Sequence, residues 1–245
     1  MVRFLVGIDD TDNLESRGTG YRARQLGEVL ARAGMSSVGI TRHQLLVDPR
    51  IPYTSHNSSA CLEVTCNSAL EAELAPMCRQ FLIGTSAPGS DAGLCIVRRD
   101  RVSDDVVTFG RRAKVDALAI DAADALARAR DIDLVGLTGT GGGVIGALAA
   151  VGLRAGGNDG RFLWLPGLRE LQGVHTATEI AAQVPLDAIE TETGQAPRPG
   201  DRVSVGEWPR AIMRAGRVVL VIEEESGEQY QWVVAAKPRI KALSE

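Results

Sequence analysis

An apolar run that ends in a cluster of carboxylates opens this chain and constrains its fold more than any other feature. Residues 2–8 read Val-Arg-Phe-Leu-Val-Gly-Ile, and Asp9, Asp10 and Asp12 follow within four positions. A short run of branched and large apolar residues bounded by polar ones predicts a buried strand. The acidic cluster should then lie at the carboxyl end of that strand, which is where ligands bind in open α/β sheets.

Three carboxylates so close together favour a bound cation. Carboxylates are hard oxygen ligands, and Mg²⁺ is usually held by one or two of them while substrate phosphates complete its coordination. The cluster therefore predicts a site that binds phosphate groups through Mg²⁺. For any single Asp the alternative is a helix cap or a turn, roles that Asp readily fills.

A second informative stretch is rich in glycine. Residues 138–151 read Thr-Gly-Thr-Gly-Gly-Gly-Val-Ile-Gly-Ala-Leu-Ala-Ala-Val, after a predicted strand at 132–137. A strand, a glycine turn and a helix in succession present backbone N–H groups and a positive helix end to an anion. Glycine permits the anion to approach because a side chain would block it. The stretch predicts a phosphate-binding turn.

Other known patterns fit these two stretches less well. Gly141, Gly143 and Gly146 satisfy G-x-G-x-x-G, but no strand ending in Asp or Glu follows to hold the ribose of a dinucleotide. Asp10 and Asp12 fit the start of aspartyl-phosphate hydrolases, which also need a lysine. The chain holds three lysines, none easily placed, and it lacks the Walker pattern.

Composition limits the class of protein. The 245 residues can bury one large or two small cores, and the net charge of −4 argues against a surface built wholly for nucleic acid. We expect a cytoplasmic protein without membrane contact, since no stretch resembles a membrane span or a signal peptide. The four cysteines show no zinc-ligand spacing and are expected to be buried thiols.

Periodicity and turn residues predict a mixed α/β (α+β) chain. Helices are expected at 19–33, at 69–82, twice within 103–130, after the glycine turn and weakly at 176–188. Besides the strands at 2–8 and 132–137, strands are expected at 37–47, 60–66, 94–97, 202–205, 217–223 and 229–234. The last three should be antiparallel, and we expect this β-rich end to serve packing or self-association as a homodimer.

Four segments in this order resemble the archaeal tRNA(Ile) 2-agmatinylcytidine synthases. They are GIDDTDN at 7–13, GTGY at 18–21, DPRIPYTSHNSSA at 48–60 and GTGGGVIGALAAVG at 139–152. The match spans roughly residues 2–153, and the joint order of four motifs is far more specific than any one of them.

The resemblance implies an ATP-dependent, kinase-like domain with an inserted or adjacent ferredoxin-like subdomain. The kinase-like nucleotide-binding domain would comprise residues 1–59 and 104–160, the ferredoxin-like subdomain 60–103 and the β-rich region 161–245. Asp9, Asp10 and Asp12 would hold Mg²⁺, with Asp10 and Thr19 as catalytic residues near the γ-phosphate. The residues that would contact ATP are Gly139, Thr140, Gly141, Gly142, Gly143 and Gly146, with His43 or His56 as an additional donor. For His43, a buried structural role is the alternative.

Departures from the family bear on the substrate. The family loop carries Lys, Arg and Gly where this chain has Thr54, His56 and Asn57, and an Arg of the glycine turn is replaced here by Gly142. Fewer fixed positive charges weaken the stabilisation of a phosphoryl transition state. Because the zinc-ribbon cysteines and a recognisable nucleic-acid-binding region after Phe162 are absent as well, tRNA is a disfavoured partner.

The leading hypothesis is a Mg²⁺-dependent ATP-binding protein that transfers a phosphoryl group to activate a small-molecule acceptor. The alternative is a nucleotide-binding or regulatory module without chemistry. A structural remnant that binds nothing is the third hypothesis.

Overall fold

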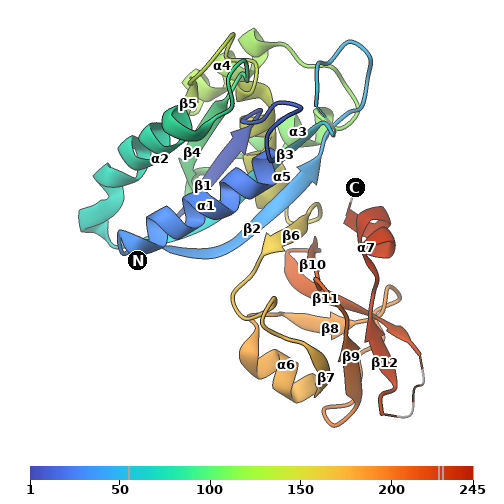
Figure 1. Cartoon of the computed structure of the whole chain (residues 1–245). Helices are drawn as coiled ribbons and strands as arrows, with labels where there is room; N and C mark the ends of the chain where they lie inside the picture. Colours follow the sequence, from blue (N-terminus) through green and yellow to red (C-terminus); the bar gives the residue numbers. More distant parts are fainter. Residues whose placement is uncertain (55, 226, 228, 245) are drawn as a thin grey trace. The chain divides into compact units, whose positions relative to one another are not determined.

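The chain divides into two compact units in the computed structural model, which describes residues 1–54, 56–225, 227 and 229–244 (Figure 1). Unit 1 is Met1–Gly156 and unit 2 is Gly157–Glu245. Both units combine helices with a β-sheet, so the predicted mixed α/β class is confirmed.

Unit 1 is built on an antiparallel sheet with the strand order β5-β4-β1-β3-β2. The strands are β1 (Val2–Asp9), β2 (Ser36–Gln44), β3 (Ser58–Cys66), β4 (Gly93–Arg98) and β5 (Asp133–Gly136). The apolar run at the start of the chain forms the central strand, because β1 pairs with β3 on one side and β4 on the other. Its residues 4–8 are buried, as a central strand covered on both faces requires.

Helices cover both faces of this sheet (Figure 1). They are α1 (Thr19–Arg32), α2 (Glu71–Thr85), α3 (Asp104–Arg112), α4 (Ile120–Ala129) and α5 (Val144–Gly156), with short 3₁₀ turns η1 (Ser68–Leu70) and η2 (Arg99–Arg101). Helix α5 packs directly on β1, since a Cβ atom added to Gly7 would overlap the carbonyl oxygen of Ala147. The lack of a side chain at Gly7 therefore permits a close approach between helix and strand.

The segment 60–103, expected to form a ferredoxin-like subdomain, supplies most of β3, then α2 and β4 to this same sheet. The strand, helix, strand pattern was read correctly from the sequence. The two strands do not pair with each other, however, because β1 lies between them. Pairing with a strand some fifty residues earlier is a long-range choice that local patterns do not record.

Unit 2 is a small β-rich body around the long strand β11. Its strands are β6 (Arg161–Trp164), β7 (Gly173–Thr176), β8 (Ala188–Glu190), β9 (Arg202–Val205), β10 (Ala211–Arg214), β11 (Arg217–Glu224) and β12 (Trp232–Val234). The first half of β11 pairs with β10 and β8, and its second half pairs with β12. Phe162, Ile180, Leu220 and Ile222 are among its buried core residues.

Unit 2 differs from the expectation in several features, among them the unpredicted strands β6, β7, β8 and β10. Strand β12 pairs with β9 in parallel, so the three predicted strands are not all antiparallel. The C-terminal helix α7 (Lys237–Ser244) was not predicted, whereas the weak helix is confirmed as the short α6 (Ala177–Gln183). A capping box fixes the start of α6, because Thr176 and Glu179 bond to each other's backbone N–H groups.

Among the residues that the structure describes, no helix combines the length and the apolar character that crossing a membrane requires.

Candidate functional site

The acidic cluster and the glycine turn meet at one end of the unit 1 sheet. Asp9 is the last residue of β1 and pairs with Gly93 at the start of β4, which in turn pairs with Gly136 at the end of β5. The glycine turn leaves β5 at this end and leads into α5. Antiparallel pairing thus places the end of β1 beside the turn, although the two are about 130 residues apart in the sequence.

Two glycines of the turn make this approach possible. The Gly143 N–H donates a 2.9 Å hydrogen bond to the backbone oxygen of Asp91, and a Cβ on Gly143 would lie within 3.0 Å of backbone atoms of Asp91, Gly93 and Asp9. A Cβ on Gly146 would overlap the Asp9 carboxylate. These two glycines are therefore needed for packing against the acidic segment.

A pocket of about 250 Å³ opens between the two segments. Asp9, Asp10, Gly142, Gly143 and Gly146 line it together, so the two stretches singled out in the sequence share one cavity. Asp10 adopts a left-handed backbone conformation with φ of 50°, which turns the chain at the end of β1. A non-glycine residue held in this region carries strain that is often found at functional sites.

The carboxylates in this pocket disfavour one another's charge. The pKa of Asp9 is raised to about 7, chiefly by burial and then by the neighbouring charges of Asp10 and Asp12, while a backbone hydrogen bond from Asp10 opposes the rise. Burial also raises the pKa of Asp10, followed by the charge of Asp91. A bound cation would relieve this repulsion, because an opposite charge favours the ionised form.

Three N–H groups of the glycine turn are already bonded within the chain. Thr140 donates to the Asp91 carboxylate, Gly141 donates to the Thr138 carbonyl, and Gly143 donates to the Asp91 carbonyl. Among the described hydrogen bonds, the N–H of Gly142 has no acceptor, and a Cβ there would meet nothing closer than 3.5 Å. Gly142, which lines the pocket, is thus one turn residue whose amide is available to a ligand.

Asp12 and Thr19 lie beside this pocket without lining it. The carboxylate of Asp12 accepts hydrogen bonds from the Thr19 N–H (2.9 Å) and hydroxyl (2.8 Å) and from the Thr54 hydroxyl (2.9 Å). Thr19 is buried, and its hydroxyl oxygen also accepts from Thr11. Asp12 therefore caps the start of α1, a role its N-cap residue Gly18 cannot fill with a side chain.

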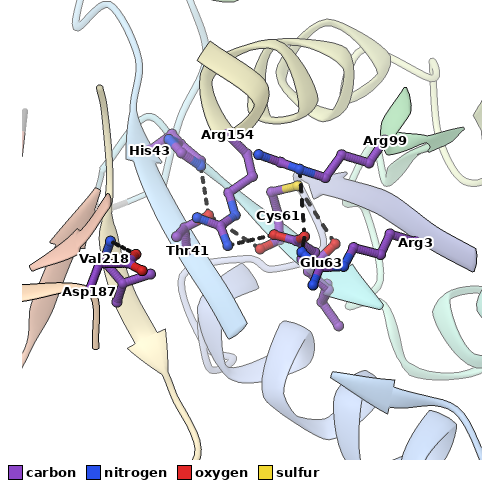
Figure 2. Close-up of polar contacts among 10 residues, drawn as sticks. Arg3, Thr41, His43, Cys61, Glu63, Arg99, Arg154, Asp187 and Val218 are labelled. Atoms are coloured by element: carbon purple, nitrogen blue, oxygen red, sulfur yellow. Dashed lines mark hydrogen bonds and ion pairs between the residues drawn. The ribbon is translucent and has the colours of Figure 1, made fainter. Parts of the chain in front are cut away.

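The two histidines of interest also lie away from the pocket. His43 is fully buried on β2, and its Nε2 lies 2.8 Å from the Thr41 hydroxyl (Figure 2). His56 is an exposed residue of the loop between β2 and β3. Within the described residues, no group of three or more His, Cys, Asp or Glu side chains is arranged to hold a metal ion, and the four cysteines are free and buried.

Sequence reasoning missed two charged residues of the site. Asp91 lines the pocket and holds the glycine turn, and Arg50 contributes a guanidinium to the same cavity. Arg50 bonds Asp48 through two nitrogens, at 2.7 and 2.9 Å. Both residues lie in loops rich in Pro, Gly and small polar residues, and the signal that could have found Arg50 was its place within a family motif.

Comparison with known proteins gives the same family as the sequence motifs. A structure of TiaS with an isoleucine tRNA and ATP is 29% identical, with a TM-score of 0.55 over 62% of this chain and 36% of that one. A tRNA fluorescent labelling enzyme is 30% identical, with a TM-score of 0.55 over 61% and 36% of the chains. Apo TiaS, an agmatidine synthetase for this tRNA, is 27% identical, with a TM-score of 0.53.

The chain spans about half of the curated relative it matches and about a third of these structures. The relative is an uncharacterized protein of Methanocaldococcus jannaschii, 24% identical over 62% of this chain and 50% of its own length. No family model matches the chain. The resemblance to the tRNA(Ile) 2-agmatinylcytidine synthases is therefore confirmed as a likeness in sequence and structure that covers 62% of this chain.

Proposed function

We propose that unit 1 binds ATP and Mg²⁺ in the pocket between the acidic cluster and the glycine turn, and transfers the γ-phosphoryl group to a small-molecule acceptor. The observation that carries this proposal is the cavity shared by Asp10 and Gly142. The similarity of the chain to a protein whose structure contains ATP supports the choice of ligand.

The residues of the pocket suit a metal-bound polyphosphate. Asp9 and Asp10 would hold Mg²⁺, which is supported by the raised pKa of each, caused first by burial and then by neighbouring carboxylates whose repulsion a cation would offset. Bound there, Mg²⁺ would neutralise charge on the phosphates. The N–H of Gly142 and the guanidinium of Arg50 would bind phosphate oxygens, since both line the cavity.

In the transfer, an acceptor oxygen bonds to the γ-phosphorus while the bond from phosphorus to the β–γ bridging oxygen breaks, and ADP leaves. Positioning and charge neutralisation supply most of the catalysis in such reactions. Asp10 is the catalytic carboxylate in this proposal. Asp12 positions α1, and Thr19 could meet a phosphoryl group only after its hydroxyl exchanges the bond to Asp12.

The hydrogen bonds of the Thr19 hydroxyl favour a second candidate, a nucleotide-binding module without turnover. The Thr19 hydroxyl is buried and bonds to both Asp12 and Thr11, so it is not presented to the pocket. The replacement of basic family residues by Thr54, His56 and Gly142 points the same way.

ATP binding and ATP turnover separate these candidates. We expect ATP with Mg²⁺ to raise the free energy of unfolding by about 2.7 kcal/mol at a ligand concentration a hundred times Kd. Asp10→Asn should lose both this stabilisation and the release of ADP. The wild-type protein should be tested with small molecules and with tRNA as acceptors. ATP binding without release of ADP would support the nucleotide-binding module without turnover. Absence of any stabilisation would refute nucleotide binding altogether.

A further inference from the structure

A cluster of arginines lies at the opposite end of β1 from the acidic pocket. Arg3 is near the start of β1, Arg98 ends β4, and Arg99 opens η2. Because β1 and β4 are antiparallel, Phe4 pairs with Arg98, which brings Arg3, Arg98 and Arg99 to the same end of the sheet. At about 3.3 Å per residue, Arg3 is roughly 20 Å along the strand from Asp9. The cluster is therefore separate from the proposed nucleotide pocket.

These arginines line a surface pocket of about 550 Å³. Its walls are Met1, Val2, Arg3, Arg98, Arg99 and Asp100. Asp100 is the acidic member, and both its carboxylate oxygens accept from Arg98, at 3.1 and 3.2 Å. Three guanidinium groups against one carboxylate leave the wall of this pocket positively charged.

The buried carboxylate of Glu63 contacts Arg3 and Arg99 from the interior of unit 1 (Figure 2). Its oxygens lie 2.7 Å from Arg154, 3.3 Å from Arg3 and 3.6 Å from Arg99, although Arg154 alone would balance its charge. Glu63 and Arg154 are each 3% exposed, whereas the side chain of Arg3 is 60% exposed. The inner ion pair is thus structural, and Arg3 and Arg99 reach outward from it.

Arg99 carries a hydrogen-bond donor that lacks an acceptor among the described residues. This donor is its Nη1 atom, which is buried. A buried donor without an acceptor costs free energy that a ligand oxygen could recover. The side chain of Arg3 is 60% exposed and that of Arg99 is 33% exposed, so both can bind a negatively charged acceptor at the surface.

We propose that Arg3, Arg98 and Arg99 form a binding site for a phosphate-type oxyanion. Arg98 is bonded to Asp100, but the exposed guanidinium of Arg3 and the partly exposed one of Arg99 can each donate charge-assisted hydrogen bonds to the tetrahedral array of phosphate oxygens. The phosphate could belong to a phosphorylated small molecule or to a nucleic-acid backbone, which present the same group. The site does not depend on the proposed function of the acidic pocket.

Titration calorimetry with inorganic phosphate tests the proposal, with total ionic strength held constant by chloride and without Mg²⁺. We expect Arg99→Gln and Arg3→Gln each to weaken phosphate binding about tenfold, the effect of one lost charge-assisted contact. Arg101→Gln is the matched control, because Arg101 is an exposed residue of the same 3₁₀ turn that does not line the pocket. Its affinity should stay within about twofold of wild type.

A second arm with short single-stranded DNA distinguishes the sources. Binding of the DNA that is lost in the same two variants would indicate a backbone phosphate, and binding of inorganic phosphate alone would indicate a small molecule. Circular dichroism would confirm folding, and Arg3→Gln decides the matter if Arg99→Gln does not fold. Absence of phosphate binding by the wild-type protein, or binding by both variants as tight as by the wild-type protein, would overturn the proposal.

Discussion

The carboxylate of Asp9 occupies space that exists because Gly146 has no side chain. Asp9 ends the first strand and Gly146 lies in the first turn of α5, so this contact joins the two segments that build the candidate site. The relationship also explains why a helix interior contains a glycine, which is otherwise unfavourable there.

Gly146→Ala is expected to lower the free energy of unfolding by about 1–3 kcal/mol, as overpacking does in a tight site. The direction is diagnostic, since alanine exceeds glycine in helix propensity by about 1 kcal/mol. Gly142→Ala is the control, because its Cβ would have room. Urea denaturation measures both variants, and a Gly146→Ala protein as stable as wild type would contradict the close contact.

The raised pKa of Asp9 predicts a stability that falls with rising pH. The unfolded carboxyl has a pKa of 3.8 and the folded one about 7, so between these values the folded state binds the proton and the unfolded state does not. The protonated form thus contributes stability below pH 3.8 that is lost as pH rises through about 7. The loss should amount to a few kcal/mol.

Asp9→Asn should flatten this part of the pH profile and stabilise the protein at about pH 8. Urea denaturation at about pH 5 and about pH 8 tests this, with Asp121→Asn at the exposed start of α4 as control. Parallel profiles for wild type and Asp9→Asn would rule out the raised pKa. Mg²⁺ bound by Asp9 should restore stability at the higher pH in the wild-type protein and less in the variant.

The hydroxyl of Thr19 is expected to stabilise the start of α1. Thr19→Val keeps the shape of the side chain but removes the partner of Asp12 and Thr11, which should cost about 1–3 kcal/mol. Thr19→Ser retains the hydroxyl and should restore most of that stability. If Thr19→Val abolished ADP release at unchanged stability, its hydroxyl would have a catalytic role in place of this structural one.

Asp91 is expected to hold the glycine turn in its ligand-binding shape. Asp91→Ala removes the acceptor of the Thr140 N–H, so the turn should loosen and ATP affinity should fall about tenfold. Asp91→Asn keeps a side-chain oxygen and should lose less. Calorimetric titration with ATP and Mg²⁺ measures this effect, and equal affinities for wild type and Asp91→Ala would contradict the assigned role.

Glu63 is expected to be the most sensitive carboxylate for folding. Glu63→Gln leaves Arg154 charged and buried beside a neutral amide, and breaking a buried ion pair typically costs about 3–5 kcal/mol. The double variant Glu63→Gln, Arg154→Met should recover part of the loss, since no charge then remains buried. A double variant no more stable than the single one, by urea denaturation, would show that Arg154 is held by other contacts.

The elements of unit 1 could be predicted from the sequence because their signals are local. The apolar run before Asp9, the helix starting at Thr19 and the strand, glycine turn and helix around Gly142 are all present as expected. The order of the strands could not be predicted, because insertion of β1 between β3 and β4 depends on pairings between distant segments. The same limit hid the parallel pairing of β12 with β9, whereas α7 was missed as a short local element.

By itself, the sequence determined which residues carry charge, where the glycines are, and that four motifs occur in the order of a known family. Tertiary structure alone decided how they are used. It gave Asp12 to the start of α1, buried His43 beside Thr41, and brought Asp91 and Arg50 into the pocket. The physical reason is that hydrogen-bond partners and burial depend on which distant strands pair, whereas residue type and spacing are properties of the chain alone.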